Sequence, residues 1–256
     1  LASEGCYYFF FFFRRFGKSL LISTMEAYFR GKTELFEGLA ISKLEKEWNT
    51  YPILHLDLNS REYKDESSLE TELNRHLEQW EKIYGDEFCQ RASEERFLHV
   101  IDKAFEQTGR PVVILVDEYD KPLLQTIGNN VLQDIYRSKL KAFYSVLKTQ
   151  DAKIRFAFLT GVTKFGKVSV FSDLNNMTDI SFDRRYSAIC GVTEAELHEY
   201  FDASVAELAD VNGMTKDECY GQLKLDYDGY HFDWNTPGIY NPFSLLNTLS
   251  SCQFRD

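Results

Sequence analysis

Five consecutive apolar residues, Val112–Val116, run directly into two carboxylates, Asp117 and Glu118. An uninterrupted run rich in β-branched residues predicts a strand that is buried on both faces, as in a parallel sheet. In open α/β sheets, ligands bind at the carboxyl ends of such strands. Two charges at that end of a buried strand are costly unless water or a cation compensates them. The segment therefore predicts an α/β fold with a ligand site at Asp117 and Glu118.

Apolar strand patterns alternate with amphipathic helical patterns over residues 1–189. We expect strands at Cys6–Phe13, Ile53–Leu58, Val112–Val116 and Ile154–Leu159, and helices at 18–29, 69–80, 97–105 and 131–147. This alternation is typical of βαβ units and a mostly parallel sheet.

Residues 190–256 change to a helical pattern. Thr193 is a favourable N-cap with Glu194 and Glu196 in the first turn, and one helix is expected to extend its apolar face to Leu208. We predict a small helical subdomain over this range, of the lid or winged-helix kind and truncated.

Composition limits the class of protein. The chain carries 29 Lys and Arg against 40 Asp and Glu, a net charge of −11, which argues against a broad basic surface for nucleic acid. Its five cysteines are widely spaced without a Cys-x-x-Cys pair, which favours reduced thiols over a disulfide framework or a zinc site. No apolar run reaches the ~18–20 residues of a membrane span. We therefore expect a cytoplasmic protein without membrane contact and, because residue 1 is Leu, a fragment of a longer chain.

Gly17, Lys18 and Ser19 follow the first predicted strand and open the first predicted helix. In a phosphate loop of this layout, backbone N–H groups and the helix dipole attract phosphate oxygens. Lys18 then reaches the β- and γ-phosphates, and the Ser19 hydroxyl ligates magnesium. Phe12 stands where the full pattern has its first glycine, which removes backbone freedom beside the phosphate. The alternative is a surface helix terminus capped by Ser19. Residues 12–19 are the candidate phosphate loop.

The functional interpretation of the acidic pair assigns Asp117 to magnesium and Glu118 to polarising the attacking water. The alternative is a strand that ends in a solvated loop, with Asp120 capping the next helix. The predicted strand 53–58 lies between the two motifs, so at least one strand should separate the phosphate-loop strand from the acidic strand. That separation favours the additional-strand (ASCE) class of P-loop NTPases, which implies a three-layer α/β/α sandwich.

In that class the strand after the acidic one ends in a polar sensor of the γ-phosphate. Thr160 takes this place, with Thr163 as a second candidate, and the alternative is a threonine bonded within its own turn. Four arginines are candidates for stabilising transition-state charge, and we select Arg185 among Arg14, Arg15, Arg184 and Arg185. The alternative for each is a solvated surface side chain.

Five phrases together resemble the bacterial AAA-ATPase-like family of the P-loop superfamily. They are residues 14–20, 116–122, 159–164, 171–176 and 240–244, which span almost the whole chain in the family's order. Members usually read Arg-Pro-Arg-Arg-Phe-Gly-Lys-Ser around the phosphate loop, whereas Phe12 and Phe13 replace the Arg-Pro here. The resemblance implies ATP and Mg²⁺ as ligands, with slow, partner-stimulated hydrolysis. The residues that it assigns to nucleotide binding are Arg15, Phe16, Gly17, Lys18, Ser19 and Leu20.

Fuller family members often add a C-terminal restriction-endonuclease-like domain, so nucleic acid is expected to contact only regions outside this chain. A homo-oligomer or a protein partner is expected besides ATP. Two alternatives to a plain ATPase stay open. One is a degenerate pseudo-ATPase that serves as an interaction module, favoured by Phe12 and Phe13. The other is the ATPase part of a nuclease-linked protein that processes nucleic acid.

Overall fold

The computed structural model describes residues 6–163, 170–171, 177–230 and 238–254. The chain packs as two compact units. The first comprises Leu1–Phe12 and Ile22–Thr178, and the second comprises Phe13–Leu21 and Asp179–Asp256. The segment 13–21 therefore groups with C-terminal residues. The predicted division into an ATPase core (1–189) and a C-terminal subdomain (190–256) stays a prediction.

A five-stranded sheet forms the centre of the first unit, with the strand order β2-β3-β4-β1-β5. The pairs β2–β3, β3–β4 and β4–β1 are all parallel. The strands are β1 (Tyr7–Phe11), β2 (Ile53–Asp57), β3 (Val112–Asp117), β4 (Ile154–Gly161) and β5 (Thr178–Asp179). Every residue of β3 is buried, which confirms the predicted buried strand of an α/β fold with a mostly parallel sheet.

The strand that separates β1 from β3 is β4, and the expectation that strand 53–58 does so was wrong. β2 lies on the far side of β3, where Ile53–Asp57 pair in register with Val113–Asp117. Position along the chain did not predict the neighbour, because strand order is fixed by which faces and edges pair in three dimensions. The separation itself holds, with one strand between β1 and β3.

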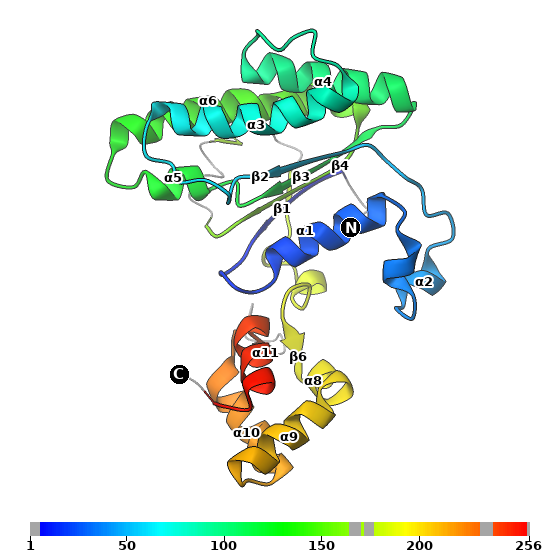
Figure 1. Ribbon diagram of the computed structural model, residues 1–256, viewed down its shortest axis with the longest axis vertical. Helices are drawn as coiled ribbons and strands as arrows, with labels where there is room; N and C mark the ends of the chain where they lie inside the picture. The colour runs from blue at the N-terminus through cyan, green and yellow to red at the C-terminus, as the bar shows by residue number, and fades with distance from the viewer. Residues whose placement is uncertain (1–5, 164–169, 172–176, 231–237, 255–256) are drawn as a thin grey trace. The chain divides into compact units, whose positions relative to one another are not determined.

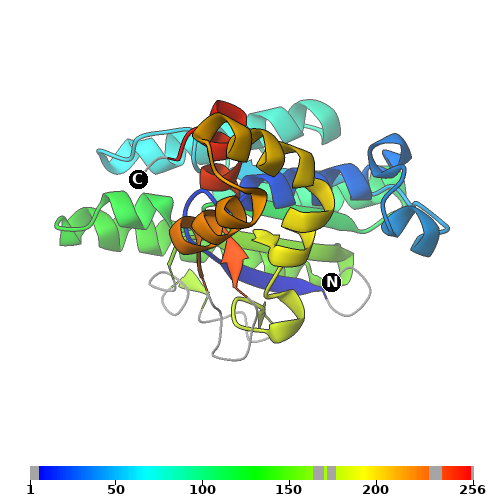
Figure 2. The same ribbon diagram turned by 90° about the horizontal axis from the view of Figure 1, so that it is seen from below.

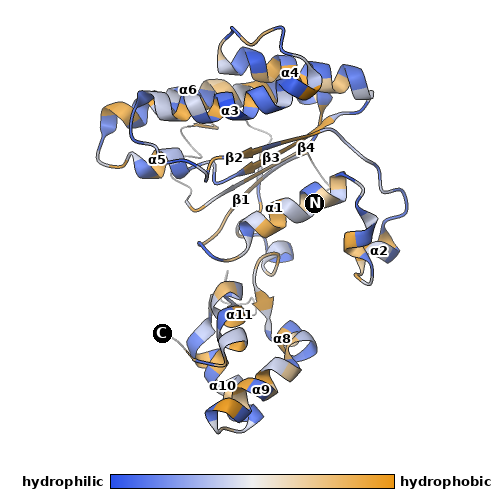
Figure 3. Ribbon diagram, viewed as in Figure 1, coloured by the Kyte–Doolittle hydropathy of each residue, from blue (hydrophilic) through white to orange (hydrophobic). Residues whose placement is uncertain are grey.

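Helices cover both faces of the sheet (Figure 1). On one face lie α3 (Glu66–Tyr84), α4 (Ser93–Thr108) and α6 (Asn130–Thr149), and α5 (Lys121–Gln125) precedes α6. α1 (Lys18–Phe29) lies on the other face, followed by η1 (Thr33–Phe36) and α2 (Ile41–Leu44), while η2 (Asp151–Lys153) leads into β4. The central strands are mostly hydrophobic, whereas hydrophobic and hydrophilic residues alternate along the helices (Figure 3), as expected for a buried sheet between helical layers.

The phenylalanine run is part of the core on both faces of the sheet. Phe9 packs with the layer of α3, α4 and α6, whereas Phe10 meets Phe158 on the opposite face. The backbone N–H of Phe12 donates to the Gly161 carbonyl at 3.0 Å, so pairing with β4 continues past the end of β1. The Phe12 ring stacks on Phe10, with centroids 5.7 Å apart. Phe12 therefore has a structural role as a buried residue directly after β1.

A buried carboxylate ties α3 to the loop after β2. Glu72 accepts hydrogen bonds from the Ser60 hydroxyl (2.7 Å), from Nε of Arg61 (3.1 Å) and from Arg75. Burial by itself raises the pKa of Glu72, but these donors outweigh burial and lower it to about 2. The network fixes the carboxyl end of β2 against the helical layer.

We expect Glu72→Gln to lower the free energy of unfolding at pH 7 by about 1–3 kcal/mol, discounted because the two arginines are partly exposed. The folded pKa of about 2 lies below the ordinary 4.5, so the stabilisation is complete above pH 4.5 and disappears as the pH falls through 2. Urea denaturation between pH 2 and 7 measures it, with the exposed Glu78→Gln on the same helix as control. A difference between wild type and Glu72→Gln that does not shrink toward pH 2 contradicts this account.

The second unit is mainly helical and has its own core. Its elements are η3 (Arg184–Tyr186), β6 (Val192–Thr193), α8 (Glu194–Tyr200), α9 (Asp202–Asn212), α10 (Lys216–Tyr227), β7 (Asp228–Tyr230), β8 (Ile239–Tyr240) and α11 (Pro242–Ser251). The helices α8 to α11 gather together (Figures 1 and 2) around ten buried residues that include Leu197, Val205 and Leu208. Within the described ranges of both units, no helix has the length and apolar character needed to cross a bilayer.

Two expectations for this region need correction. The single helix expected to reach Leu208 is broken at Phe201 into α8 and α9, and Tyr200 stays exposed while Val205 and Leu208 reach the core. The region is also not purely helical, because β6, β8 and β7 form a small antiparallel sheet. The predicted N-cap is confirmed: Thr193 and Glu196 form a reciprocal capping box.

Candidate functional site

The two central strands of the first unit, β3 and β4, end side by side at one edge of the sheet. Asp117 is buried there, and the Thr160 hydroxyl donates to its Oδ1 at 2.6 Å. The same hydroxyl oxygen accepts the backbone N–H of Glu118 at 3.3 Å. A bond this short to a carboxylate is strong, and it offsets part of the cost of burying Asp117. Thr160 therefore fixes the orientation of the aspartate from the neighbouring strand.

Glu118 has an unusual backbone for its residue type. Its φ is +54°, in the left-handed region that residues other than glycine, asparagine and aspartate rarely adopt. The next residue holds the turn in place, because the N–H of Tyr119 donates to the Thr160 carbonyl at 2.9 Å. Strained backbone of this kind concentrates at functional sites.

Asp120 does not cap the following helix, which was the alternative reading of this residue. It stands at the N-cap of α5 but makes no capping bond. Its carboxylate instead accepts the N–H groups of Val162 (3.0 Å) and Thr163 (2.7 Å) and the Thr163 hydroxyl (2.9 Å). Burial dominates and raises the pKa of Asp120, and these donors only partly oppose it. Asp120 thus joins the turn after β3 to the segment after β4.

The acidic turn, residues 117–120, is also clamped by an aromatic ring. Tyr119 is fully buried, and its hydroxyl donates to the Thr163 carbonyl at 2.8 Å. Gly161 lies directly beneath this ring: a Cβ there would collide with Tyr119 and approach Asp120 Oδ1 to 2.9 Å. A glycine is therefore required at the end of β4 by close packing.

We expect Gly161→Ala to lower the free energy of unfolding by at least about 2 kcal/mol, because the locked Tyr119 ring cannot move aside. Gly221→Ala is the matched control, since a Cβ at this position in α10 meets no described atom within 4 Å. Alanine there should be neutral or stabilise by up to about 1 kcal/mol. Urea denaturation of both variants decides the question, and equal effects at the two glycines contradict the clamp.

Two residues at this edge were given no site role from the sequence. One is Asp120, which was considered as a helix cap, and the other is Asp57, which pairs in register with Asp117 at the end of β2. The sequence places Asp57 directly after the apolar positions Leu54 and Leu56, which face the helical layer of α3 and α4, and so at the carboxyl end of β2. The parallel pairing that makes Asp57 a neighbour of Asp117 is not visible in the sequence.

In the second unit, the candidate phosphate loop has an alternating backbone. Arg15 and Gly17 have φ of +68° and +86°, whereas Phe16 between them does not have a positive φ. Alternation of this kind turns successive N–H groups toward one concavity that suits an anion. The Gly17 carbonyl accepts the first helical bond of α1, from the N–H of Leu21 at 2.9 Å. The geometry supports an anion-binding loop at the start of α1.

Lys18 folds back onto the loop that precedes it. Its ammonium donates to the Phe13 carbonyl at 3.2 Å, and the side chain is buried. Lys18 also partly opposes the burial that raises the pKa of Cys190 to about 12, so this thiol stays protonated near neutral pH. Ser19 and Leu20 are exposed. The ammonium of Lys18 is thus held close to the backbone of the candidate phosphate loop.

The other predicted site residues have mixed placements. Arg185 is exposed and forms an ion pair with Asp183, 2.6 Å apart, and Arg14 is also exposed. Thr163 serves Asp120, so of the two candidate threonines Thr160 is the one that bonds to Asp117. Lys164 and residues 172–176, which contributed to the family phrases, lie outside the described residues.

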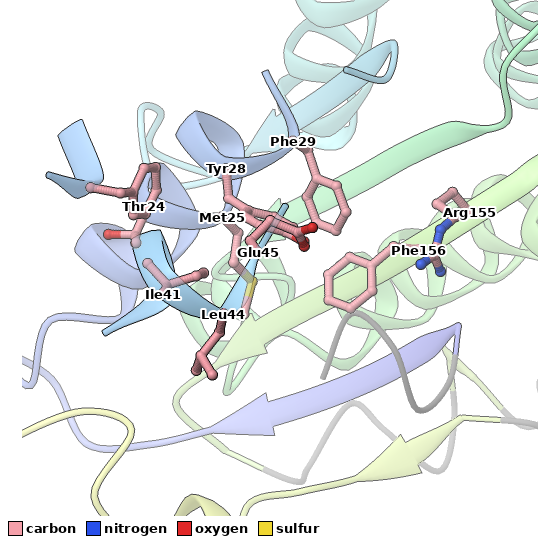
Figure 4. A pocket seen from close by; sticks show the side chains of 10 residues that line it. Thr24, Met25, Tyr28, Phe29, Ile41, Leu44, Glu45, Arg155 and Phe156 are labelled. Carbon is pink, nitrogen blue, oxygen red and sulfur yellow. The ribbon is translucent and has the colours of Figure 1, made fainter. Parts of the chain in front are cut away.

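A separate pocket lies at the opposite end of the strands. It has a volume of about 540 Å³ and is formed by α1, η1, α2 and the beginning of β4 (Figure 4). Met25, Ile41 and Phe156 contribute an apolar lining, while Glu45 and Arg155 contribute charge. Arg155 and Phe156 stand at the amino end of β4, whereas Thr160 stands at its carboxyl end. This pocket is therefore not the site at the acidic turn.

Comparison with known proteins assigns the family. The family profile described as "Predicted AAA-ATPase" matches residues 1–171, two thirds of the chain. The chain belongs to this family. Membership suggests nucleotide binding, and it agrees with an α/β fold built on a mostly parallel sheet.

A relative in Azotobacter chroococcum mcd 1 is 38% identical over 255 residues and is described as "Uncharacterized protein in vnfD 5'region". The match covers all of this chain and 47% of the relative, so the chain spans about half the length of that protein. No solved structure matches the chain.

Proposed function

We propose that this AAA-ATPase-like chain binds magnesium–ATP at the carboxyl edge of its sheet and hydrolyses it. The observation that carries the proposal is the parallel order β3-β4-β1 in the first unit. Because parallel strands share a direction, Phe12, where the chain leaves β1 for the candidate phosphate loop, and Asp117 stand at the same edge. Two strand spacings separate the strands, about 10 Å.

The loop supplies the groups for phosphate. Backbone N–H groups around Arg15 and Gly17 would bind phosphate oxygens, and the N-terminal end of α1 adds a favourable dipole. Lys18 would exchange its bond to the Phe13 carbonyl for the β- and γ-phosphates. Phe16, Ser19 and Leu20 complete the proposed nucleotide-binding segment.

The donor set fits magnesium. Asp117 offers a carboxylate and Ser19 a hydroxyl, which are hard oxygen ligands, and magnesium completes its shell with phosphate oxygens and water. Within the described residues no cluster of three or more His, Cys, Asp or Glu side chains could hold a metal alone. This suits an ion that arrives with its nucleotide. When bound, magnesium neutralises charge on the phosphates.

The remaining roles fall on the acidic turn and an arginine. Glu118, which has a left-handed backbone, is proposed as the residue that polarises the attacking water. Thr160 is proposed as the γ-phosphate sensor. Because its hydroxyl donates to Asp117, a bound γ-phosphate that attracts this hydroxyl would also change the hydrogen bonding of the aspartate. Arg185 is proposed to stabilise developing charge, for which it must leave Asp183. We also propose a protein partner or a second copy of the chain as a binding partner besides ATP.

Substituting Lys18 and Glu118 should separate binding from hydrolysis. We expect Lys18→Ala to weaken Mg–ATP binding at least about 30-fold, because the phosphates lose a charged partner. Glu118→Gln should keep the affinity and lower turnover by about 10²–10⁴-fold, because the amide cannot accept the proton of water. Calorimetry and phosphate release measure the two effects, with the exposed Lys32→Ala beyond the far end of α1 as control. Equal ATP affinity for wild type and Lys18→Ala would refute the site.

The competing function is an interaction module that has lost nucleotide binding, favoured by Phe12 and Phe13 in place of Arg-Pro. Thermal unfolding with and without Mg–ATP distinguishes the two. Ligand at 100 times its Kd adds about 2.7 kcal/mol, which should raise the Tm by about 5 °C or more. No shift at millimolar Mg–ATP, with an intact folded baseline, would favour the interaction module.

A further inference from the structure

The phrase at residues 240–244 is not used by the phosphate chemistry, yet it builds a rigid start to α11. The Asn241 side chain accepts the N–H groups of Phe243 (3.0 Å) and Ser244 (3.2 Å), and Pro242 occupies the first helical position. An N-cap combined with proline at this position is a preorganised helix start. The backbone of Phe243 is therefore held in place.

The guanidinium of Arg15, in the candidate phosphate loop, lies over the ring of Phe243. Cζ of Arg15 stands 4.7 Å from the ring centroid, well inside the range of a cation–π interaction. Both residues belong to the second unit, in which segment 13–21 packs with residues 179–256. The contact therefore joins two parts of the sequence that are more than two hundred residues apart, at the loop proposed to bind phosphate.

Phe243 contributes little to the core of its own unit. Its side chain is 46% exposed, whereas Leu245 and Leu249 on the same helix are buried in that core. Arg15, in turn, has a φ of +68°, which disfavours any residue with a Cβ. Something other than intrinsic preference must hold Arg15 in this conformation, and the exposed ring of Phe243 is placed to do so.

We propose that Phe243 is a positioning residue that holds Arg15, and with it the phosphate loop, in the anion-binding conformation before nucleotide arrives. This rests on the proposed function. Because coupling between two sites is reciprocal, bound phosphate would stabilise the position of α11 by the same factor. The helices of the second unit would thereby respond to phosphate binding at the loop.

Loop order is tested first without nucleotide, by hydrogen–deuterium exchange of the backbone amides at 13–18. Phe243→Leu keeps an apolar side chain but removes the ring, and should speed exchange about two- to fivefold, as expected for a cation–π contact at an exposed site. Phe243→Tyr should restore the wild-type rate. Leu246→Ala is the matched control, since Leu246 lies on the same helix and is 47% exposed. Unchanged exchange in Phe243→Leu overturns the proposal.

A second variant separates positioning from a general loss of structure. Glycine adopts positive φ without a steric penalty, so Arg15→Gly should make the loop indifferent to residue 243. We expect Phe243→Leu to weaken Mg–ATP binding about two- to fivefold in the wild-type background and to have no effect in the Arg15→Gly background. An equal effect in both backgrounds overturns the proposal.

The two proposals fail in distinguishable ways. If neither wild type nor any variant binds Mg–ATP, the proposed function fails, while the exchange measurement still decides whether Phe243 orders the loop. If wild type binds Mg–ATP and Phe243→Leu matches it in both affinity and exchange, only the role of Phe243 is overturned.

Discussion

The parallel pairing of β3 with β4 is the constraint on which the candidate site depends. It brings Thr160 to Asp117, and it lets the acidic turn be held by two side chains that reach across to the segment after β4, namely Asp120 and Tyr119. The Thr160–Asp117 bond is buried and the other two are partly buried, so each lost partner would leave a polar group with little access to water. The Asp117 carboxylate, which we propose as a magnesium ligand, is thus kept buried and oriented by the Thr160 hydroxyl.

The elements of the fold follow closely from the sequence, because hydrophobic period and capping are local properties. The strand at 112–116 and the helix at 18–29 could be predicted from their own residues alone, and Thr193 identified the start of its helix. The order of the strands could not be predicted from the sequence, because it is not a local property. Strand order is decided by pairing between residues that are about 40 to 150 positions apart along the chain. For this reason the sequence indicated the wrong neighbour for β2 and did not indicate that Asp57 lies beside Asp117. Asp120 was likewise assigned a local cap, whereas its partners come from across the sheet edge.

The phenylalanine run shows that a departure from a sequence motif does not by itself show that the backbone conformation is lost. Glycine matters in a loop where φ is positive or where no side chain fits. Phe12 meets neither condition, since it is paired with Gly161 and its ring stacks on Phe10 in the core. The close approach that needs a glycine lies on the partner strand, at Gly161 beneath Tyr119. A departure from the usual loop sequence is therefore compatible with an ordered strand end.

The candidate phosphate loop and the acidic turn share one backbone feature, a non-glycine residue in the left-handed region. Within the described residues, four non-glycine residues have positive φ, and two of them are Arg15 in the candidate phosphate loop and Glu118 in the acidic turn. Such conformations persist only where surrounding groups hold them. For Glu118 the holders are on the neighbouring strand, where Thr160 accepts its N–H. For Arg15 the holder we infer is a ring from the far end of the chain, 4.7 Å away. A glycine at residue 15 would adopt the conformation unaided, but it would also make the loop independent of α11. An arginine would make the shape of the loop depend on the helices of the second unit, as we propose for a nucleotide site that responds to a partner.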